Sequence, residues 1–199
     1  VKHLRKLDAQ QRERVWQAKF GNQLKGKTIG IVGVGSIGEE IASRAKAFGM
    51  RVLGSRKRLE LSAPNSVDRL YSFSDIDVLL GESDVVVMAA PSTIETRDLF
   101  DESKFSKMKR GSIFVNVARG IHVVEADLAT YLSNGHLRAA ILDVVRNEPL
   151  GVNSDLWAMP NLYLSPHCSV SFDEYERNAI DLFIRNAIRL LGGDELINK

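Results

Sequence analysis

Short apolar runs alternate with segments of helical periodicity along most of this chain. The clearest run, Thr28–Val32, reads TIGIV and predicts a buried strand, and Ile37–Phe48 follows it with its apolar residues on one helical face. The same pattern predicts further strands over Val52–Gly54, Asp84–Met88, Ser112–Val115, Ala139–Leu142 and Leu162–Leu164. It predicts helices over Asp75–Leu80, from the Asp101 cap to Met108, over Glu125–Leu132 before Asn134-Gly135, and from the capping-box segment Ser171–Glu174 to about Leu191.

The predicted strands are apolar throughout and do not alternate with polar residues, which is typical of parallel sheets covered on both faces. The sequence therefore predicts an α/β fold with a doubly wound parallel sheet. Residues 56–73 are interpreted as a polar loop, and residues 1–19 as a charged helix or arm that needs a partner surface.

Composition adds little to this picture. Hydrophobic residues make up 44% and charged residues 26% of 199 residues, as in ordinary globular domains. The formal charge of +2 argues neither for nor against nucleic acid, and we expect no nucleic-acid partner. A single cysteine, Cys168, rules out a disulfide within one chain and favours a cytoplasmic location. No run is apolar enough for a bilayer, so we expect no membrane association.

A glycine-rich turn, Gly33-Val-Gly35-Ser36-Ile37-Gly38, lies between a predicted strand and a predicted helix. In that setting the GxGxxG spacing indicates dinucleotide binding, because Gly33 allows the tight turn and Gly35 lets a pyrophosphate approach the backbone. Gly38 lets the helix pack closely on the strand, and the amides at the helix start face the phosphates. The alternative is a glycine-rich turn that binds nothing.

The second strand indicates which dinucleotide is preferred. NAD-specific domains place an acidic residue at this strand end, whereas here Ser55 is followed by Arg56, Lys57 and Arg58. A hydroxyl and cations can bind a ribose 2′-phosphate, which a carboxylate would repel. We therefore expect NADP(H) to be preferred, with NAD(H) possible; the alternative is a solvated basic loop.

Three further motifs follow the later strands. They are Val115–Gly120 with Arg119, Leu142–Val144 followed by Glu148-Pro149, and Ser165–His167. Their order and spacing, beside the glycine turn, resemble the D-isomer-specific 2-hydroxyacid dehydrogenase family from about Gly26 to Asn198. The family resemblance implies a Rossmann-type fold and a substrate-binding arginine, an acidic partner and an acid/base histidine at these three positions.

The chemistry of these residues agrees with that resemblance. Reduction of a 2-keto acid needs a fixed cation for the carboxylate, which Arg119 can supply. It needs a proton donor that titrates near neutrality, such as His167, and a carboxylate such as Glu148 to favour the imidazolium. The alternatives are a surface-turn arginine, a loop glutamate and a buried, hydrogen-bonded histidine.

The resemblance also implies other contacts with the cofactor. Asp143 corresponds to the family position that meets the nicotinamide carboxamide, although it can equally be a strand-end cap. The remaining implied contacts are Ala90, Pro91, Thr93, Val117, Ala118, Arg119 and His167. Because His3, His122 and His136 have no metal-ligand spacing, we expect no metal.

The resemblance further implies a two-domain enzyme of which most of the substrate domain is absent here. We expect residues 1–20 to form a connecting arm, 21–192 the dinucleotide-binding domain and 193–199 a tail toward the missing domain. The basic motif looks most like NADPH-dependent glyoxylate/hydroxypyruvate reductases, with a small 2-keto or 2-hydroxy acid as substrate. The isolated chain should bind cofactor with little turnover, and a homodimer through this domain is expected. The alternative is a dinucleotide-sensing interaction module of the corepressor type.

Overall fold

The computed structural model describes residues 3–57, 64–169 and 174–197 as two compact units. The first unit extends through Leu164 and contains the sheet. The second begins at Ser165 and contains α6 (Tyr175–Gly192), which ends at Gly193 in the left-handed region, φ +78°. The predicted cap at Ser171 lies outside the described residues, and α6 begins after Glu174. In the described part of the chain no helix is both long and apolar enough to span a membrane.

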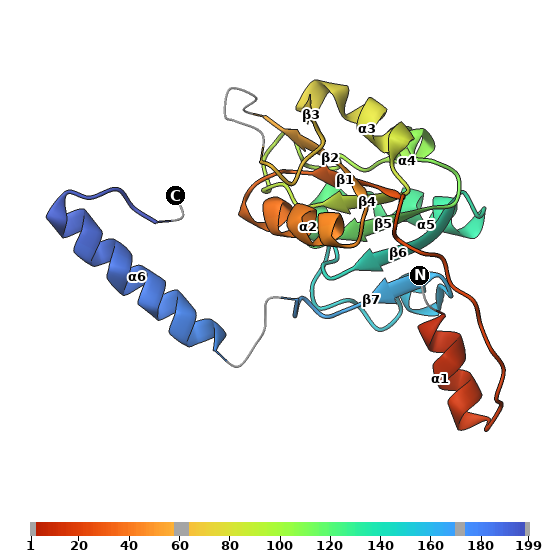
Figure 1. The fold of residues 1–199 in the computed structure, drawn as a ribbon. Coiled ribbons are helices and arrows are strands. Elements are labelled where there is room, and N and C mark those ends of the chain that lie inside the picture. Colours follow the sequence, from red (N-terminus) through yellow and green to blue (C-terminus); the bar gives the residue numbers. More distant parts are fainter. Residues whose placement is uncertain (1–2, 58–63, 170–173, 198–199) are drawn as a thin grey trace. The chain divides into compact units, whose positions relative to one another are not determined.

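The first unit is built on one parallel sheet in the order β3-β2-β1-β4-β5-β6-β7 (Figure 1). Its strands are β1 (Thr28–Val32), β2 (Arg51–Arg56), β3 (Arg69–Ser72), β4 (Val85–Met88), β5 (Ser112–Asn116), β6 (Leu137–Leu142) and β7 (Leu162–Leu164). Each neighbouring pair is parallel, which confirms the predicted doubly wound α/β fold.

Two apolar cores lie on the two faces of this sheet. One packs α3, α4 and α5 on the sheet through Leu79, Phe105 and Leu128, and the other packs α2 on β1 and β2 through Ala42 and Ala45. The helices are α1 (Leu4–Arg12), α2 (Ser36–Ala47), α3 (Ile76–Glu82), α4 (Glu102–Lys107) and α5 (Glu125–Ser133). Two predicted ends are confirmed, because the Asp101 carboxylate accepts from Lys104 N at 3.1 Å and Asn134 ends α5, whereas α3 runs to Glu82, past the predicted end at Leu80.

Two sequence-based expectations were wrong. Residues 56–73 are not loop throughout, because Arg69–Ser72 forms the edge strand β3 in register with β2, Leu53 opposite Arg69. The strands are also not all buried on both faces. Ile141 of β6 is 41% exposed, because within the first unit α2 packs on β1 and β2 and does not reach β6.

The chain order reverses at β1, whose neighbours are β2 on one side and β4 on the other. Connections from such neighbouring strands leave toward opposite faces, so a crevice opens beyond their carboxyl ends. The glycine turn begins at Gly33, directly after the last residue of β1.

Candidate functional site

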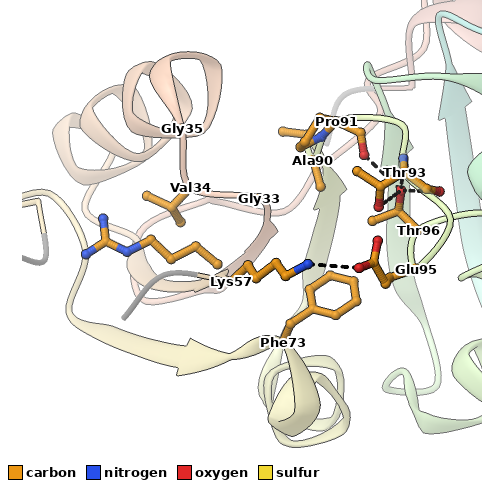
Figure 2. Close-up of a pocket in the computed structure, with 12 residues that line it drawn as sticks. Gly33, Val34, Gly35, Lys57, Phe73, Ala90, Pro91, Thr93, Glu95 and Thr96 are labelled. Carbon is orange, nitrogen blue, oxygen red and sulfur yellow. Dashed lines mark hydrogen bonds and ion pairs between the residues drawn. The ribbon is translucent and has the colours of Figure 1, made fainter. Parts of the chain in front are cut away.

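A pocket of about 330 Å³ lies at this crevice and gathers residues from four strand ends (Figure 2). Its volume falls in the range of small-molecule sites. It is lined by Gly33, Val34 and Gly35 after β1, Arg56 and Lys57 at the end of β2, Phe73 after β3, and Ala89, Ala90, Pro91, Thr93, Glu95 and Thr96 after β4. Seven of these residues were predicted from the sequence to bind the cofactor. They are Gly33, Gly35, Arg56, Lys57, Ala90, Pro91 and Thr93.

The three glycines of the turn have different structural roles. Gly33 has φ +104°, and a Cβ on it would lie 2.4 Å from the backbone nitrogen of Ala90. A Cβ on Gly38 would lie 2.3 Å from the Gly33 carbonyl oxygen. A Cβ on Gly35, by contrast, would meet no described atom within 4 Å apart from its chain neighbours. Gly33 and Gly38 are therefore required by the fold, whereas the space in front of Gly35 is open to a ligand.

The backbone of β2 holds the turn in place. The amides of Gly33 and Val34 both donate to the carbonyl oxygen of Ser55, each at 3.0 Å. The Ser55 side chain is fully buried, and its hydroxyl has no hydrogen-bond partner within the described residues. Gly35 is the N-cap of α2, where no side chain of the described chain caps the helix. The first amides of α2 thus lie at the pocket, and helix starts of this kind bind phosphate.

The loop after β4 closes the other side of the pocket and is organised by Thr96. The hydroxyl of this buried residue donates to the Pro91 carbonyl at 2.8 Å and accepts from Thr93 N at 2.8 Å. The Thr96 carbonyl lies 2.9 Å from Nδ1 of His122, a fully buried histidine that follows β5. His122 therefore connects the loops that follow two neighbouring strands.

The burial of His122 predicts a pH dependence of stability. Loss of hydration lowers the pKa of this imidazole below 6.5, and the positive charge of Arg119 lowers it further. The unfolded chain then binds this proton at a higher pH than the folded chain. The stability that the neutral His122 imidazole contributes is therefore fully present above pH 6.5 and is lost as the pH falls from there toward the folded-state pKa. Urea unfolding of wild type and His122→Asn at several pH values tests this. The variant should lose less stability on acidification, and equal losses would contradict the prediction.

The turn after β5 carries Arg119 at the carboxyl edge of the sheet. The buried Asn116 side chain fixes this turn, because its amide donates to the Arg119 carbonyl at 2.9 Å and its oxygen accepts from Ala118 N at 3.0 Å. The Arg119 side chain is exposed, and its Nη1 donates to the Ala118 carbonyl at 2.6 Å. Val117 and Ala118 are half-buried between β5 and this arginine.

The turn after β5 packs tightly on the loop after β6. A Cβ on Gly120 would lie 2.0 Å from the Val145 carbonyl carbon, so the two backbones touch. In that second loop Glu148 is exposed, and its carboxylate accepts from Val145 N at 3.1 Å. Asp143, directly after β6, is buried. The fold thus brings the segments of two predicted catalytic residues, Arg119 and Glu148, side by side.

Arg146 joins three loops around this site. Its Nη2 donates to the Val123 carbonyl at 2.7 Å and forms an ion pair with Asp98, while its backbone amide donates to the Glu125 carboxylate at 2.7 Å. The Arg146 side chain is 31% exposed, so solvent weakens these contacts only in part.

Replacing Arg146 with methionine should therefore destabilise the fold. The variant keeps the aliphatic packing but leaves the Val123 carbonyl and the Asp98 carboxylate without their donor, which should cost roughly 1–3 kcal/mol. Arg44→Met is the matched control, since Arg44 forms an exposed ion pair with Glu40 within α2 and should cost less than about 0.5 kcal/mol. Chemical denaturation compares the two; equal losses would contradict the assigned role.

His167 belongs to the second unit and lies three residues beyond the end of β7. It is exposed and has φ +51°, and its amide donates to the Ser165 carbonyl at 3.0 Å. Its position relative to Arg119 and Glu148 stays a prediction. Within residues 3–57, 64–169 and 174–197, no group of three or more His, Cys, Asp or Glu side chains is placed to hold a metal ion.

The pocket residues that sequence reasoning did not name as cofactor contacts are Val34, Phe73, Ala89, Glu95 and Thr96. Phe73 was missed together with β3. Thr93 and Thr96 have the spacing of a hydroxyl-capped turn, which was a usable signal. Glu95 had none, because its contact with Lys57 spans 38 residues.

Comparison with known proteins places this arrangement in a family. Residues 1–169 match the family described as D-isomer specific 2-hydroxyacid dehydrogenase, NAD binding domain. A glyoxylate/hydroxypyruvate reductase B from Klebsiella pneumoniae is 39% identical over 176 residues, which are 88% of this chain and 54% of the reductase. The chain thus spans about half the length of the curated relatives it matches.

Solved structures show the same similarity. A D-isomer specific 2-hydroxyacid dehydrogenase family protein from Aeromonas salmonicida superposes with a TM-score of 0.87 at 39% identity, covering 98% of this chain and 62% of that one. An NADPH-dependent glyoxylate/hydroxypyruvate reductase from Sinorhizobium meliloti, in complex with NADP and sulfate, gives 0.86 at 30% identity, with the same coverage of both chains. These relatives are reductases and dehydrogenases, so they lend no support to the corepressor-type alternative.

Proposed function

Because this chain belongs to the D-isomer specific 2-hydroxyacid dehydrogenase family, through the NAD-binding domain of that family, we propose that it binds NADP(H) as the cofactor of a 2-hydroxyacid reductase. The observation that carries this proposal is a single pocket, at the point where the strand order reverses, that joins the open face of Gly35 to Arg56 and Lys57. An opening in front of a helix start fits a pyrophosphate, and the two cations fit a ribose 2′-phosphate.

The preference for NADP(H) is testable by titration. The described end of β2 offers no carboxylate that could accept a hydrogen bond from a ribose 2′-hydroxyl. Arg58 lies outside the described residues. The Sinorhizobium relative contains NADP, which supports the assignment. Calorimetric titration with NADP⁺ and NAD⁺ should give tighter binding of NADP⁺, and equal or tighter binding of NAD⁺ would refute it.

We propose that the reaction of the whole protein is reduction of a small 2-keto acid, with glyoxylate and hydroxypyruvate as the first substrates to test. When bound, the reduced cofactor supplies the hydride. Arg119 pairs with the substrate carboxylate and polarises its carbonyl. In this proposal His167 is the proton donor to the carbonyl oxygen as it becomes an alkoxide, and Glu148 is the carboxylate that would orient the imidazole and favour its protonated form. Asp143 holds the carboxamide side of the nicotinamide.

The activity has to be measured on a protein that includes the part of the relatives beyond this chain. The chain alone holds substrate from one side and leaves the reacting groups open to water, so we expect cofactor binding with little turnover. Tight NADPH binding by the complete protein without reduction of any 2-keto acid in a broad panel would overturn the enzymatic assignment.

A homodimer through this domain is a further part of the proposal. Val15, Trp16 and Phe20, which follow α1, are large apolar residues with exposed side chains. Such residues in a charged arm are typical of an interface. Sedimentation at micromolar concentration should show a dimer that Trp16→Glu dissociates, and a purely monomeric wild type would contradict the interface. The single cysteine is consistent with a cytoplasmic location for that dimer.

A further inference from the structure

An ion pair crosses the proposed nucleotide pocket. Lys57 follows β2 and Glu95 lies in the loop after β4, and their charged atoms are 2.8 Å apart (Figure 2). Since β2 and β4 flank β1 on its two sides, the pair bridges the crevice beyond the strand that carries the glycine turn. Both residues line the pocket.

The pair is weakly held, and its Glu95 carboxyl is ionised. The two side chains are 81% and 57% exposed, and exposed pairs of this kind contribute little to stability. The Lys57 ammonium, assisted by the Thr93 hydroxyl, lowers the pKa of the Glu95 carboxyl to about 2. At neutral pH Glu95 is therefore an anion that already forms an ion pair with Lys57.

We propose that Glu95 is a specificity-determining residue that competes with the ribose 2′-phosphate for Lys57, so that the Lys57–Glu95 pair is exchanged when a 2′-phosphorylated dinucleotide binds. This rests on the proposed function, namely that the pocket binds NADP(H). A phosphate monoester carries a charge of about −1.5 to −2, more than one carboxylate, so it displaces Glu95 from an exposed ammonium. The displaced carboxylate stays nearby and opposes the phosphate.

The proposal predicts a specific effect on the discrimination between NADP⁺ and NAD⁺. Removing the Glu95 charge leaves Lys57 available to the phosphate. It also removes a negative charge that repels the phosphate, so NADP⁺ should bind more tightly. NAD⁺ has a neutral hydroxyl at the same position, and its affinity should hardly change. A residue that merely supports the loop would alter both affinities together.

Calorimetry of the 199-residue chain with NADP⁺ and NAD⁺ tests this. Glu95→Gln should tighten NADP⁺ by roughly three- to tenfold and leave NAD⁺ within about twofold. Lys57→Gln should weaken NADP⁺ alone. Glu40→Gln is the matched control, because it removes the same charge from an exposed ion pair that does not line the pocket, and should change neither affinity.

The contrary outcomes distinguish failure of the competition at Lys57 from failure of the proposed NADP(H) binding. Three outcomes would overturn the competition while leaving NADP(H) binding intact. Glu95→Gln could bind NADP⁺ no more tightly than wild type, it could bind both dinucleotides more tightly by the same factor, or Glu40→Gln could show the same gain. A wild type that binds neither dinucleotide would overturn the proposed function, and the competition with it.

Discussion

Replacing Gly35 with alanine should severely weaken dinucleotide binding while leaving the stability of the domain nearly unchanged. The backbone at Gly35, φ −116° and ψ −160°, is ordinary extended conformation that alanine adopts without strain. The added Cβ would point into open space in the folded chain, so no packing is lost. Restricting the unfolded chain should even add about 0.4–1 kcal/mol of stability.

That open space is where we place the pyrophosphate. A methyl group there would hold the phosphates away from the amides at the start of α2. Charge-assisted hydrogen bonds contribute about 1.5–3 kcal/mol each, so losing two of them should weaken NADP⁺ binding by at least roughly 100-fold. Calorimetry measures the affinity, and urea unfolding measures the stability.

Gly33→Ala is the control with the opposite pattern. Its φ of +104° is strained for any residue with a Cβ, and that Cβ would overlap the Ala90 backbone. Strain and overpacking together should destabilise the fold by roughly 3 kcal/mol or more. A Gly35→Ala variant that binds NADP⁺ like wild type would remove the basis for placing a phosphate at this turn.

The two glycines also show how far the sequence alone could lead. The GxGxxG spacing predicted the turn and its ligand, because strand, turn and helix are local features with local signals. The same motif assigned the tight turn to Gly33 and the ligand to Gly35, but it could not show which atoms exclude a side chain at Gly33. The nearest of these atoms belong to Ala90, which lies in the loop after β4 and is distant in sequence.

The same reason explains what was missed. Arg69–Ser72 is short and has polar residues at both ends, and it becomes a strand through its pairing with β2 at the sheet edge. Arg119 and Glu148 were found because the motifs that carry them resemble those of the family, yet the contact between their loops depends on Gly120 and Val145, which no local pattern reveals. Contacts between the loops at the carboxyl edge are tertiary, and they form most of the site.

Reversing the charge of Arg56 should convert the cofactor preference. Arg56 is the last residue of β2 and lines the pocket, at the position where NAD-specific domains carry an acidic residue. Arg56→Asp removes a donor to the 2′-phosphate and places a repelling carboxylate there instead. The lost contact alone is worth about 10- to 150-fold in affinity.

NAD⁺ should respond in the opposite direction, because the new carboxylate can accept a hydrogen bond from its 2′-hydroxyl. Together these effects should change the ratio of the two dissociation constants by roughly 100- to 1,000-fold in favour of NAD⁺. Arg110→Asp is the matched control: it makes the same charge change at an exposed arginine before the amino end of β5, at the opposite edge of the sheet, and should leave the ratio unchanged. If Arg56→Asp also leaves the ratio unchanged, the basic segment after β2 is a solvated loop and the choice of cofactor is made elsewhere in the pocket.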